Sequence, residues 1–225
     1  MKIKGYIKED YTEIADSFRK NFESYGEFGA SLCVYHNNKK VIDIWGGHKD
    51  SKKDKEWNKD TVVPLFSTTK AVAASCLAIC HSRGLFDYYR KISEYWPEFG
   101  VENKKEITIE QLLQHRAGLS AIDEKLDTKK IRDRKFLDNI IATQKPHWKP
   151  GNFQGYHVWN IGWYISSLLS RFEPKKRFLK EFLEQDVIPQ IEGEVRIGVE
   201  NNYEWTKIAT LIPFSKIKGL FSMPI

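Results

Sequence analysis

One segment of the sequence predicts a helix with almost no polar face, and this segment constrains the fold more than any other. Residues 67–83 are small or apolar nearly all round the helical circumference, with alanine, valine, cysteine, leucine and isoleucine concentrated at 71–79. A helix without a polar side is expected to be buried. Gly84 is expected to end it, because glycine accepts the left-handed conformation that often follows a helix.

Before this segment, the sequence predicts a helix and a β-hairpin. Apolar residues recur at three- and four-residue steps over 11–25, and the expected apolar face comprises Tyr11, Ile14, Ala15, Phe18 and Phe22. Two β-rich runs, 30–35 and 40–45, flank Asn37 and Asn38, whose side chains tolerate turn geometry. The charged stretch 48–60 is expected to form a surface loop, and residues 62–66 are expected to re-enter the core.

After Gly84 the pattern is helical with loops. Helices are expected at 107–114, 131–144, 159–171 and 175–185, with Pro174 just inside the start of the last one. We find no internal repeat, low-complexity tract or linker, so we expect a single domain over residues 1–225.

The composition indicates a globular protein and excludes several classes. The chain has 225 residues, of which 41% are hydrophobic and 29% charged, enough to form a core. The net charge is +6, but acidic and basic residues alternate over 48–56, which is typical of a solvated surface rather than a nucleic-acid site. The longest apolar run, Ala71 to Cys80, is too short to cross a membrane. No apolar signal segment opens the chain, so a cytoplasmic location is expected.

The three cysteines do not predict a disulfide framework. Their number is odd, and such frameworks belong to small secreted proteins. Cys76 and Cys80, with His81 beside them, have a spacing that would place two sulfurs on one helix face, as a metal site needs. No second ligand pair follows at zinc-like spacing, so we interpret both cysteines as core residues and expect no metal or cofactor.

Ser67-Thr68-Thr69-Lys70 matches the S-x-x-K pattern of serine acyl-enzymes. The pattern alone is weak, because Ser17/Lys20 and Ser215/Lys218 match it too. Ser67 differs in context: it begins the predicted buried helix, where the helix N-terminus would stabilise a developing anion. Burial would favour the neutral amine of Lys70, which could then accept the serine proton. The alternative is a structural serine cap with a lysine that reaches solvent.

A second motif carries a tyrosine. The segment 149–163 places Tyr156 in a loop rich in glycine and proline, just ahead of a predicted helix. A phenol beside a lysine has a lowered pKa and can move a proton.

Several ordered motifs then resemble one family. They are Gly46-Gly47 and the segments 60–71, 96–100, 107–119, 150–151, 155–157 and 162–163. The likeness runs from about residue 28 to 213 and is to the serine β-lactamase-like superfamily, which includes class C β-lactamases, penicillin-binding proteins and family VIII esterases. The chain most resembles the β-lactamase domain-containing proteins of animals.

The resemblance implies an α+β fold of the β-lactamase/transpeptidase type, in which helices flank an antiparallel sheet and a helical lobe is attached. It implies that Ser67 is the nucleophile, Lys70 its activating partner, and Tyr156 the general base or proton relay. The class C pattern Tyr-x-Asn would place asparagine at position 158, where this chain has Val158. We interpret His115, His147 and His157 as structural.

The third motif of the family, Lys-Thr-Gly or His-Ser/Thr-Gly on an edge strand, is not found. Lys216-Ile217-Lys218-Gly219 resembles it only in outline. We therefore expect an incomplete domain that has the first two strands of the sheet and lacks the C-terminal ones.

Two functions remain open. The first is a serine hydrolase that acts through an acyl-enzyme on an ester, amide or lactam, with a small-molecule or peptide-like acyl substrate and no nucleic-acid or membrane partner. The second is a truncated, catalytically inactive member of the family that binds a partner or has no function, because an unpaired sheet edge tends to seek another strand.

Overall fold

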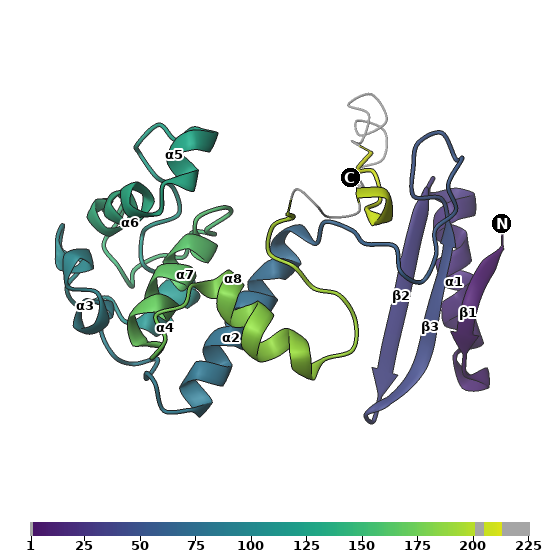
Figure 1. The fold of residues 1–225 in the computed structure, drawn as a ribbon, viewed down its shortest axis with the longest axis horizontal. Helices are drawn as coiled ribbons and strands as arrows, with labels where there is room; N and C mark the ends of the chain where they lie inside the picture. Colours follow the sequence, from purple (N-terminus) through teal and green to yellow (C-terminus); the bar gives the residue numbers. More distant parts are fainter. Residues whose placement is uncertain (1, 201–204, 213–225) are drawn as a thin grey trace. The chain divides into compact units, whose positions relative to one another are not determined.

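The computed structural model describes residues 2–200 and 205–212, which divide into two compact units. The first unit comprises residues up to Pro64 together with the described residues from Val199 onwards, and the second comprises Leu65–Gly198. Figure 1 shows strands in the first unit and most of the helices in the second. The expectation of a single domain over 1–225 stays a prediction.

The first unit contains an antiparallel three-stranded sheet. Its strands are β1 (Ile3–Ile7), β2 (Gly29–His36) and β3 (Lys39–Gly47), in the order β1-β3-β2. The predicted hairpin is confirmed as β2 and β3, which pair antiparallel from Gly29 opposite Gly47 to His36 opposite Lys39. Asn37 and Asn38 form its turn with φ values of 50° and 59°, the left-handed geometry that asparagine tolerates.

Strand β1 is absent from the sequence-based expectation. It is five residues long and has Gly5 at its centre, which weakens any strand signal. Pairing with a neighbouring strand stabilises β1, which lies antiparallel to β3 from Ile3 opposite Gly46 to Ile7 opposite Ile42. The described sheet therefore has three strands, where two were expected.

Helix α1 (Thr12–Ser24) covers the sheet and confirms the first predicted helix. Ala15 and Phe18 are buried in a cluster with Val41, Ile42 and Ile44 of β3. Ile14 is 37% exposed, so its assignment to the apolar face was wrong. Tyr11 lies in a short 3-10 turn, Glu9–Tyr11, ahead of the helix.

The predicted return to the core after the charged loop is wrong for Leu65 and Phe66. These side chains are 45% and 62% exposed. Val62 pairs instead through its backbone: its N–H donates to the Lys207 carbonyl at 2.9 Å, and the Ala209 N–H donates to the Val62 carbonyl at 2.8 Å. Backbone hydrogen bonds therefore hold residue 62 in place, and the apolar side chains of residues 62–66 are not all buried.

The second unit is helical. Its α-helices are α2 (Thr69–Ser82), α3 (Ile92–Tyr95), α4 (Ile109–Leu113), α5 (Thr128–Arg132), α6 (Arg134–Thr143), α7 (Ile161–Phe172) and α8 (Leu179–Phe182). Short 3-10 turns occur at Phe66–Thr68, Pro97–Gly100 and Ile188–Gln190, and a π-helical turn at Leu183–Val187. Together with the sheet, these helices confirm the predicted α+β class.

Helix α2 lies where the sequence predicts a buried helix, but burial on every side was wrong. Ala73, Cys76, Leu77 and Cys80 are buried, whereas Ala71, Ala74, Ser75 and Ala78 are exposed. The exposed residues are small, so leaving them in water costs little. Gly84 ends the helix as predicted: with φ of 70°, it donates to the His81 carbonyl, and Leu85 donates to the Cys80 carbonyl, the pattern of a Schellman motif.

The other predicted helices are partly confirmed. Helix α7 matches 159–171, and α4 is a shorter form of 107–114 that begins at a capping box of Thr108 and Gln111. The predicted helix 131–144 is divided at Asp133, whose side chain accepts a hydrogen bond from the Phe136 N–H and so begins α6. These helices pack around a buried cluster that includes Trp96, Phe99 and Tyr164.

The predicted helix start at Pro174 was wrong. The chain turns there, with Lys176 at φ of 57°, and α8 begins only at Leu179. The buried carboxylate of Glu173 holds the turn, because it accepts hydrogen bonds from the backbone N–H and the guanidinium of Arg177. The ion pair between Glu173 and Arg177 therefore outweighs the local sequence preference for a helix at this position.

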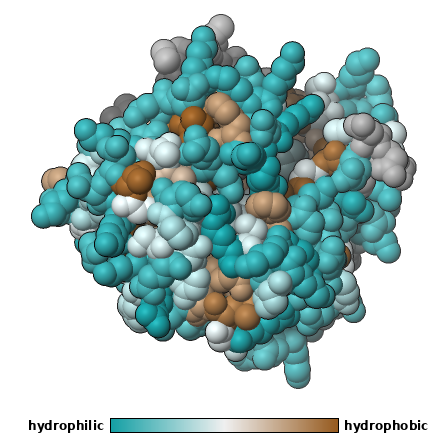
Figure 2. Space-filling view, turned by 60° about the vertical axis from the view of Figure 1, so that its left-hand side comes forward, coloured by the Kyte–Doolittle hydropathy of each residue, from teal (hydrophilic) through white to brown (hydrophobic). Residues whose placement is uncertain are grey.

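The face of the molecule shown in Figure 2 is mostly hydrophilic. On the face shown in Figure 2, hydrophobic residues form small, separate groups among hydrophilic ones. No helix in the described ranges combines the length and apolar character that a membrane span requires.

Candidate active site

Ser67 lies in the 3-10 turn Phe66–Thr68, immediately before helix α2. Phe66 has φ of 47°, a left-handed conformation that costs a residue with a side chain roughly 1–3 kcal/mol. The N–H of Thr68 donates to the Leu65 carbonyl at 3.1 Å and closes the turn. This strained turn presents the Ser67 hydroxyl at the N-terminus of α2, where partial positive charge favours an anion.

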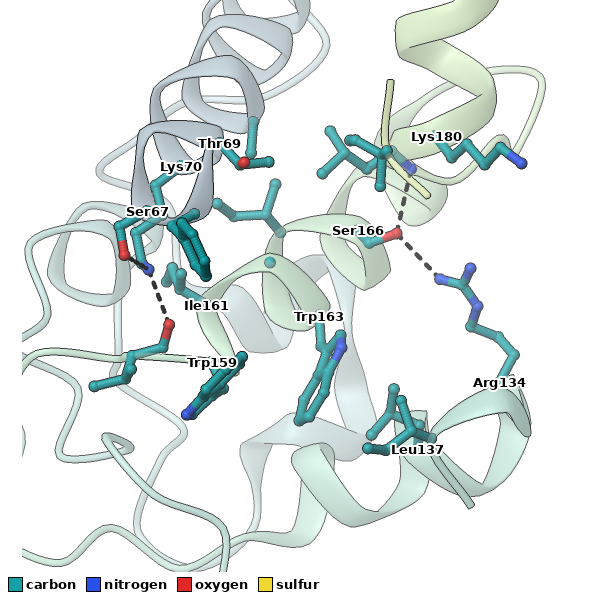
Figure 3. A pocket seen from close by; sticks show the side chains of 18 of the residues that line it. Ser67, Thr69, Lys70, Arg134, Leu137, Trp159, Ile161, Trp163, Ser166 and Lys180 are labelled. Carbon is teal, nitrogen blue, oxygen red and sulfur yellow. Dashed lines mark hydrogen bonds between the residues drawn. The ribbon is translucent and has the colours of Figure 1, made fainter. Parts of the chain in front are cut away.

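Lys70 lies in the first turn of α2 and points back to Ser67. Its Nζ atom donates hydrogen bonds to the Ser67 Oγ at 3.1 Å and to the Val158 carbonyl at 2.9 Å (Figure 3). The side chain of Lys70 is therefore held between the start of the helix and the segment that carries the second motif.

Tyr156 completes the group. The Lys70 Nζ lies 4.7 Å from the centre of the Tyr156 ring. The pKa of the Tyr156 phenol lies below its ordinary value of 10. The main cause is a hydrogen bond with Ser67, and the second cause is a hydrogen bond with Lys70. The structure thus brings together all three residues that the sequence analysis selected, although 86 positions separate Lys70 from Tyr156.

His115 positions the loop that carries Tyr156. Its carbonyl accepts a hydrogen bond from the Gly155 N–H at 2.9 Å, and its Nδ1 accepts one from the His157 N–H at 3.1 Å. Its ring also lies 4.9 Å from the ring of Tyr156. Burial and the charge of Lys70 lower the pKa of His115, so a neutral ring is favoured beside the cation.

His157 is completely buried behind this loop. Its Nδ1 lies 2.9 Å from the Nδ1 of His115, which already accepts the backbone N–H of His157. The proton between the two rings therefore belongs to His157, which donates it. Burial, and then the neighbouring His115, lower the pKa of His157 to about 4, which keeps it neutral. Both histidines support the loop, in keeping with their interpretation as structural residues.

A close approach explains the glycine before Tyr156. A Cβ atom on Gly155 would lie 2.2 Å from the Cη2 atom of Trp148, inside the van der Waals limit. Trp148 is fixed in turn by a hydrogen bond from its Nε1 to the Phe153 carbonyl at 3.2 Å. His147, next to it, contacts Asp123 at 3.0 Å and serves the loop rather than the site.

A pocket of about 610 Å³ opens beside Ser67 and Lys70. Trp159 and Trp163 line it, together with apolar residues of α2, α6 and α7 (Figure 3). Arg134 and Ser166 lie at its other end. These lining residues were not predicted from the sequence. Helices were predicted over 131–144 and 159–171, but nothing in their local patterns indicated that they face each other across a cavity.

The remaining candidates lie elsewhere. Burial raises the pKa of both Cys76 and Cys80 to about 11, which disfavours the thiolate that binds metals. Within the described ranges, no group of three or more potential metal ligands gathers. Ser17 is exposed on α1 in the other unit, and Ser215, Lys218 and the segment 216–219 lie outside the described residues.

Comparisons with known proteins place this geometry in a family. The sequence matches the model of the Beta-lactamase family over residues 14–193. It is 31% identical over 171 residues to the esterase/beta-lactamase LipL of Mycobacterium tuberculosis, across 74% of this chain and 38% of LipL.

Solved structures agree. The fold superposes on a family VIII carboxylesterase with a TM-score of 0.89 at 30% identity, covering 95% of this chain and 58% of that one. A penicillin-binding protein homologue from Caulobacter crescentus gives a TM-score of 0.88 at 29% identity, covering 95% and 57%.

The chain therefore spans well under two thirds of the length of each of these relatives. The match nevertheless includes the sheet hairpin, α2 and the loop with Tyr156, and the predicted β-lactamase/transpeptidase fold is confirmed. The chain belongs to the beta-lactamase family.

Proposed function

We propose that this protein is a serine hydrolase that cleaves an ester, amide or lactam through an acyl-enzyme on Ser67. The observation that carries the proposal is the convergence of Ser67, Lys70 and Tyr156. Ser67 and Lys70 also line the pocket. The names of two relatives, an esterase/beta-lactamase and a carboxylesterase, point to the same reaction class.

In the first step, Tyr156 acts as the base. Lys70 donates hydrogen bonds to Ser67 and to the Val158 carbonyl, an arrangement that suits its charged form. A cation next to the phenol favours the phenolate, in line with the lowered pKa of Tyr156. The phenolate takes the proton of Ser67 as the Oγ atom attacks the carbonyl carbon of the substrate.

The tetrahedral intermediate then collapses to the acyl-enzyme. Its negative oxygen would be stabilised by the N-terminus of α2 and by the Lys70 cation. The bond to the leaving group breaks, and Tyr156 returns its proton to that group. In the second half, a water molecule loses a proton to Tyr156 and attacks the acyl carbon, and Ser67 recovers its proton as the acid departs. No cofactor takes part in this scheme.

Position 158 marks a difference from the class C pattern. The side chain of Val158 is 51% exposed and supplies no amide to a substrate, while its carbonyl accepts a hydrogen bond from Lys70. The main chain thus helps to fix the lysine at this position. An ester or amide substrate that needs no side-chain amide there fits the proposal better than a β-lactam.

A fluorophosphonate probe tests the proposal. It should label the purified 225-residue chain on the tryptic peptide that contains Ser67, and Ser67→Ala should abolish the labelling. Ser17→Ala is the matched control, because it changes the serine of another S-x-x-K pair, exposed on α1, and should leave labelling unchanged. If the folded chain is not labelled, or if Ser67→Ala is labelled equally, the hydrolase proposal is wrong and the non-catalytic binding alternative is favoured.

A further inference from the structure

The pocket beside Ser67 has an unusual charge distribution. The described residues that line it include four cationic side chains, Lys70, Arg132, Arg134 and Lys180, and no aspartate or glutamate. The rest of the lining is largely apolar and includes Trp159 and Trp163. A cleft with charges of one sign and low-dielectric walls concentrates its field and attracts ligands of the opposite sign.

Arg134 is fixed in place without an acidic partner. Its guanidinium lies 3.8 Å from the centre of the Phe178 ring, and its Nη1 atom donates to the Ser166 Oγ at 3.1 Å. In the described part of the chain, no carboxylate lies within ion-pair distance of it. The stacked ring restricts the guanidinium plane, so its remaining N–H groups are held ready for a planar acceptor.

Ser166 provides a second donor at the same place. Its side chain is nearly buried, at 8% exposed for the residue, and its Oγ accepts hydrogen bonds from Arg134 and from the Leu179 N–H at 3.2 Å. Among the described residues the Ser166 hydroxyl proton has no acceptor of its own. A nearly buried donor without an acceptor points to a ligand oxygen.

We propose that Arg134 and Ser166 form a subsite for a carboxylate at the far end of the substrate's acyl group. Figure 3 shows Ser67 and Lys70 at one end of the pocket and Arg134 and Ser166 at the other, with Trp159 and Trp163 between them. The substrate class is therefore an acyl compound whose reactive carbonyl and terminal carboxylate are separated by an apolar or aromatic spacer. This assignment rests on the proposed hydrolase function, because it names the group that Ser67 would carry.

Binding to an inactivated chain tests the subsite without any chemistry. Isothermal titration calorimetry on Ser67→Ala compares 4-phenylbutyrate with 4-phenylbutyramide, which have the same spacer but differ in charge. We expect the acid to bind at least about tenfold more tightly, the effect of one hydrogen bond to a charged group. Adding Arg134→Gln should remove most of this preference. Lys135→Gln, the same charge change at the next, exposed residue and outside the pocket lining, should retain it.

Ser166→Ala serves as a second variant if Arg134→Gln does not fold, and it should reduce the preference for the acid severalfold. Equal affinities for acid and amide, or no binding of either at millimolar concentration, would overturn the subsite. So would a preference that survives both Arg134→Gln and Ser166→Ala.

Hydrolysis separates this inference from the proposed function. Rates of hydrolysis are measured with the protein that retains Ser67. The substrates are the mono-p-nitrophenyl ester of adipic acid, which carries a terminal carboxylate, and p-nitrophenyl hexanoate, its uncharged counterpart. We expect a higher kcat/KM for the acid-terminated ester. If the acid binds preferentially but neither ester is cleaved, the hydrolase function fails and the subsite stands. If both esters are cleaved with equal kcat/KM and the two ligands bind equally, the function stands and the subsite fails.

Discussion

The amine of Lys70 donates a hydrogen bond of 3.1 Å to the hydroxyl of Ser67, from the first turn of α2 back to the strained turn that precedes it. A second bond, to the Val158 carbonyl, anchors the same amine to the loop that follows Tyr156. Lys70 therefore connects the two motifs physically, and removing it should disturb both the charge and the geometry of the site.

Lys70→Gln should lower kcat/KM for ester hydrolysis by about 10²–10⁴-fold, the range typical of general-base catalysis, because the Tyr156 base would no longer be ionised by a neighbouring cation. The amide can still form hydrogen bonds but carries no charge to favour the Tyr156 phenolate. Initial rates with p-nitrophenyl hexanoate measure the change. Lys20→Gln, on the exposed side of α1, is the control and should retain the full rate. A Lys70→Gln enzyme with unchanged kcat/KM would exclude Lys70 from the reaction.

Tyr156→Phe should change the pH profile as well as the rate. The pKa of Tyr156 is lowered, so the active phenolate forms at a lower pH than an ordinary tyrosinate, and kcat/KM should rise with pH until this ionisation is complete. The variant should lose that rise, together with about 10²-fold or more in rate. Tyr89→Phe, at a residue that is 74% exposed, should keep both. If the rise persists in Tyr156→Phe, another group is the base.

His157 should make the protein less stable in mild acid. Its pKa is about 4 when folded, against 6.5 for an unperturbed histidine, so between these pH values the unfolded chain binds a proton that the folded chain does not. The free energy of unfolding should fall as the pH drops from about 6.5 to 4, by roughly 3 kcal/mol from this group. Urea denaturation across this range measures the effect, to which His115 contributes in the same direction.

His157→Gln should flatten that pH dependence, while His36→Gln, at an exposed residue, should not. An NMR titration of the unmodified protein provides a direct check on the ring. If the His157 resonances titrate near pH 6.5 in the folded protein, burial does not control this histidine and the prediction is wrong.

The free energy of unfolding should depend on pH in the alkaline range because of Lys104. Its side chain is fully buried, donates to the Gln144 carbonyl at 2.6 Å and lies 5.2 Å from the Phe99 ring. Burial lowers its pKa to about 8, while Glu102 acts weakly in the opposite direction. Between pH 8 and 10.5 the folded chain loses this proton before the unfolded chain does, so the free energy of unfolding should rise with pH across that window.

Lys104→Met tests this effect by removing the charge and keeping most of the chain length. The alkaline rise in the free energy of unfolding, roughly 3 kcal/mol for such a shift, should disappear. At pH 7 the substitution has two opposing effects on the free energy of unfolding: removing a buried charge raises it, and losing the hydrogen bond to Gln144 lowers it. Lys105→Met, at the exposed neighbour, should leave the rise intact. Identical urea midpoints for Lys104→Met and the unmodified protein at pH 7, 8.5 and 10 would refute the assignment.

Local patterns were sufficient for several elements. Helices α1 and α7, the Asn37-Asn38 turn and the glycine stop at Gly84 depend largely on interactions within one or two turns of chain, and each element occurs where it was expected, although Ile14 of α1 is exposed. Strand β1 did not follow from local pattern because its stability comes from pairing with β3, some 40 residues away. The false helix start at Pro174 has a similar cause, since the ion pair of Glu173 and Arg177 outweighs local propensity.

The candidate site divides in the same way. Ser67 and Lys70 are three residues apart at the start of a helix, so covalent spacing alone brings their side chains within reach, and resemblance to a family added Tyr156. The distance between Lys70 and Tyr156 depends on the His115 and His157 contacts that hold the second loop. The pocket, with Arg134 facing Ser166, exists only because α6 and α7 pack together. Sequence spacing therefore determined which groups could react, whereas long-range packing decided what they would face, because contacts between distant segments leave no periodic signal in either segment.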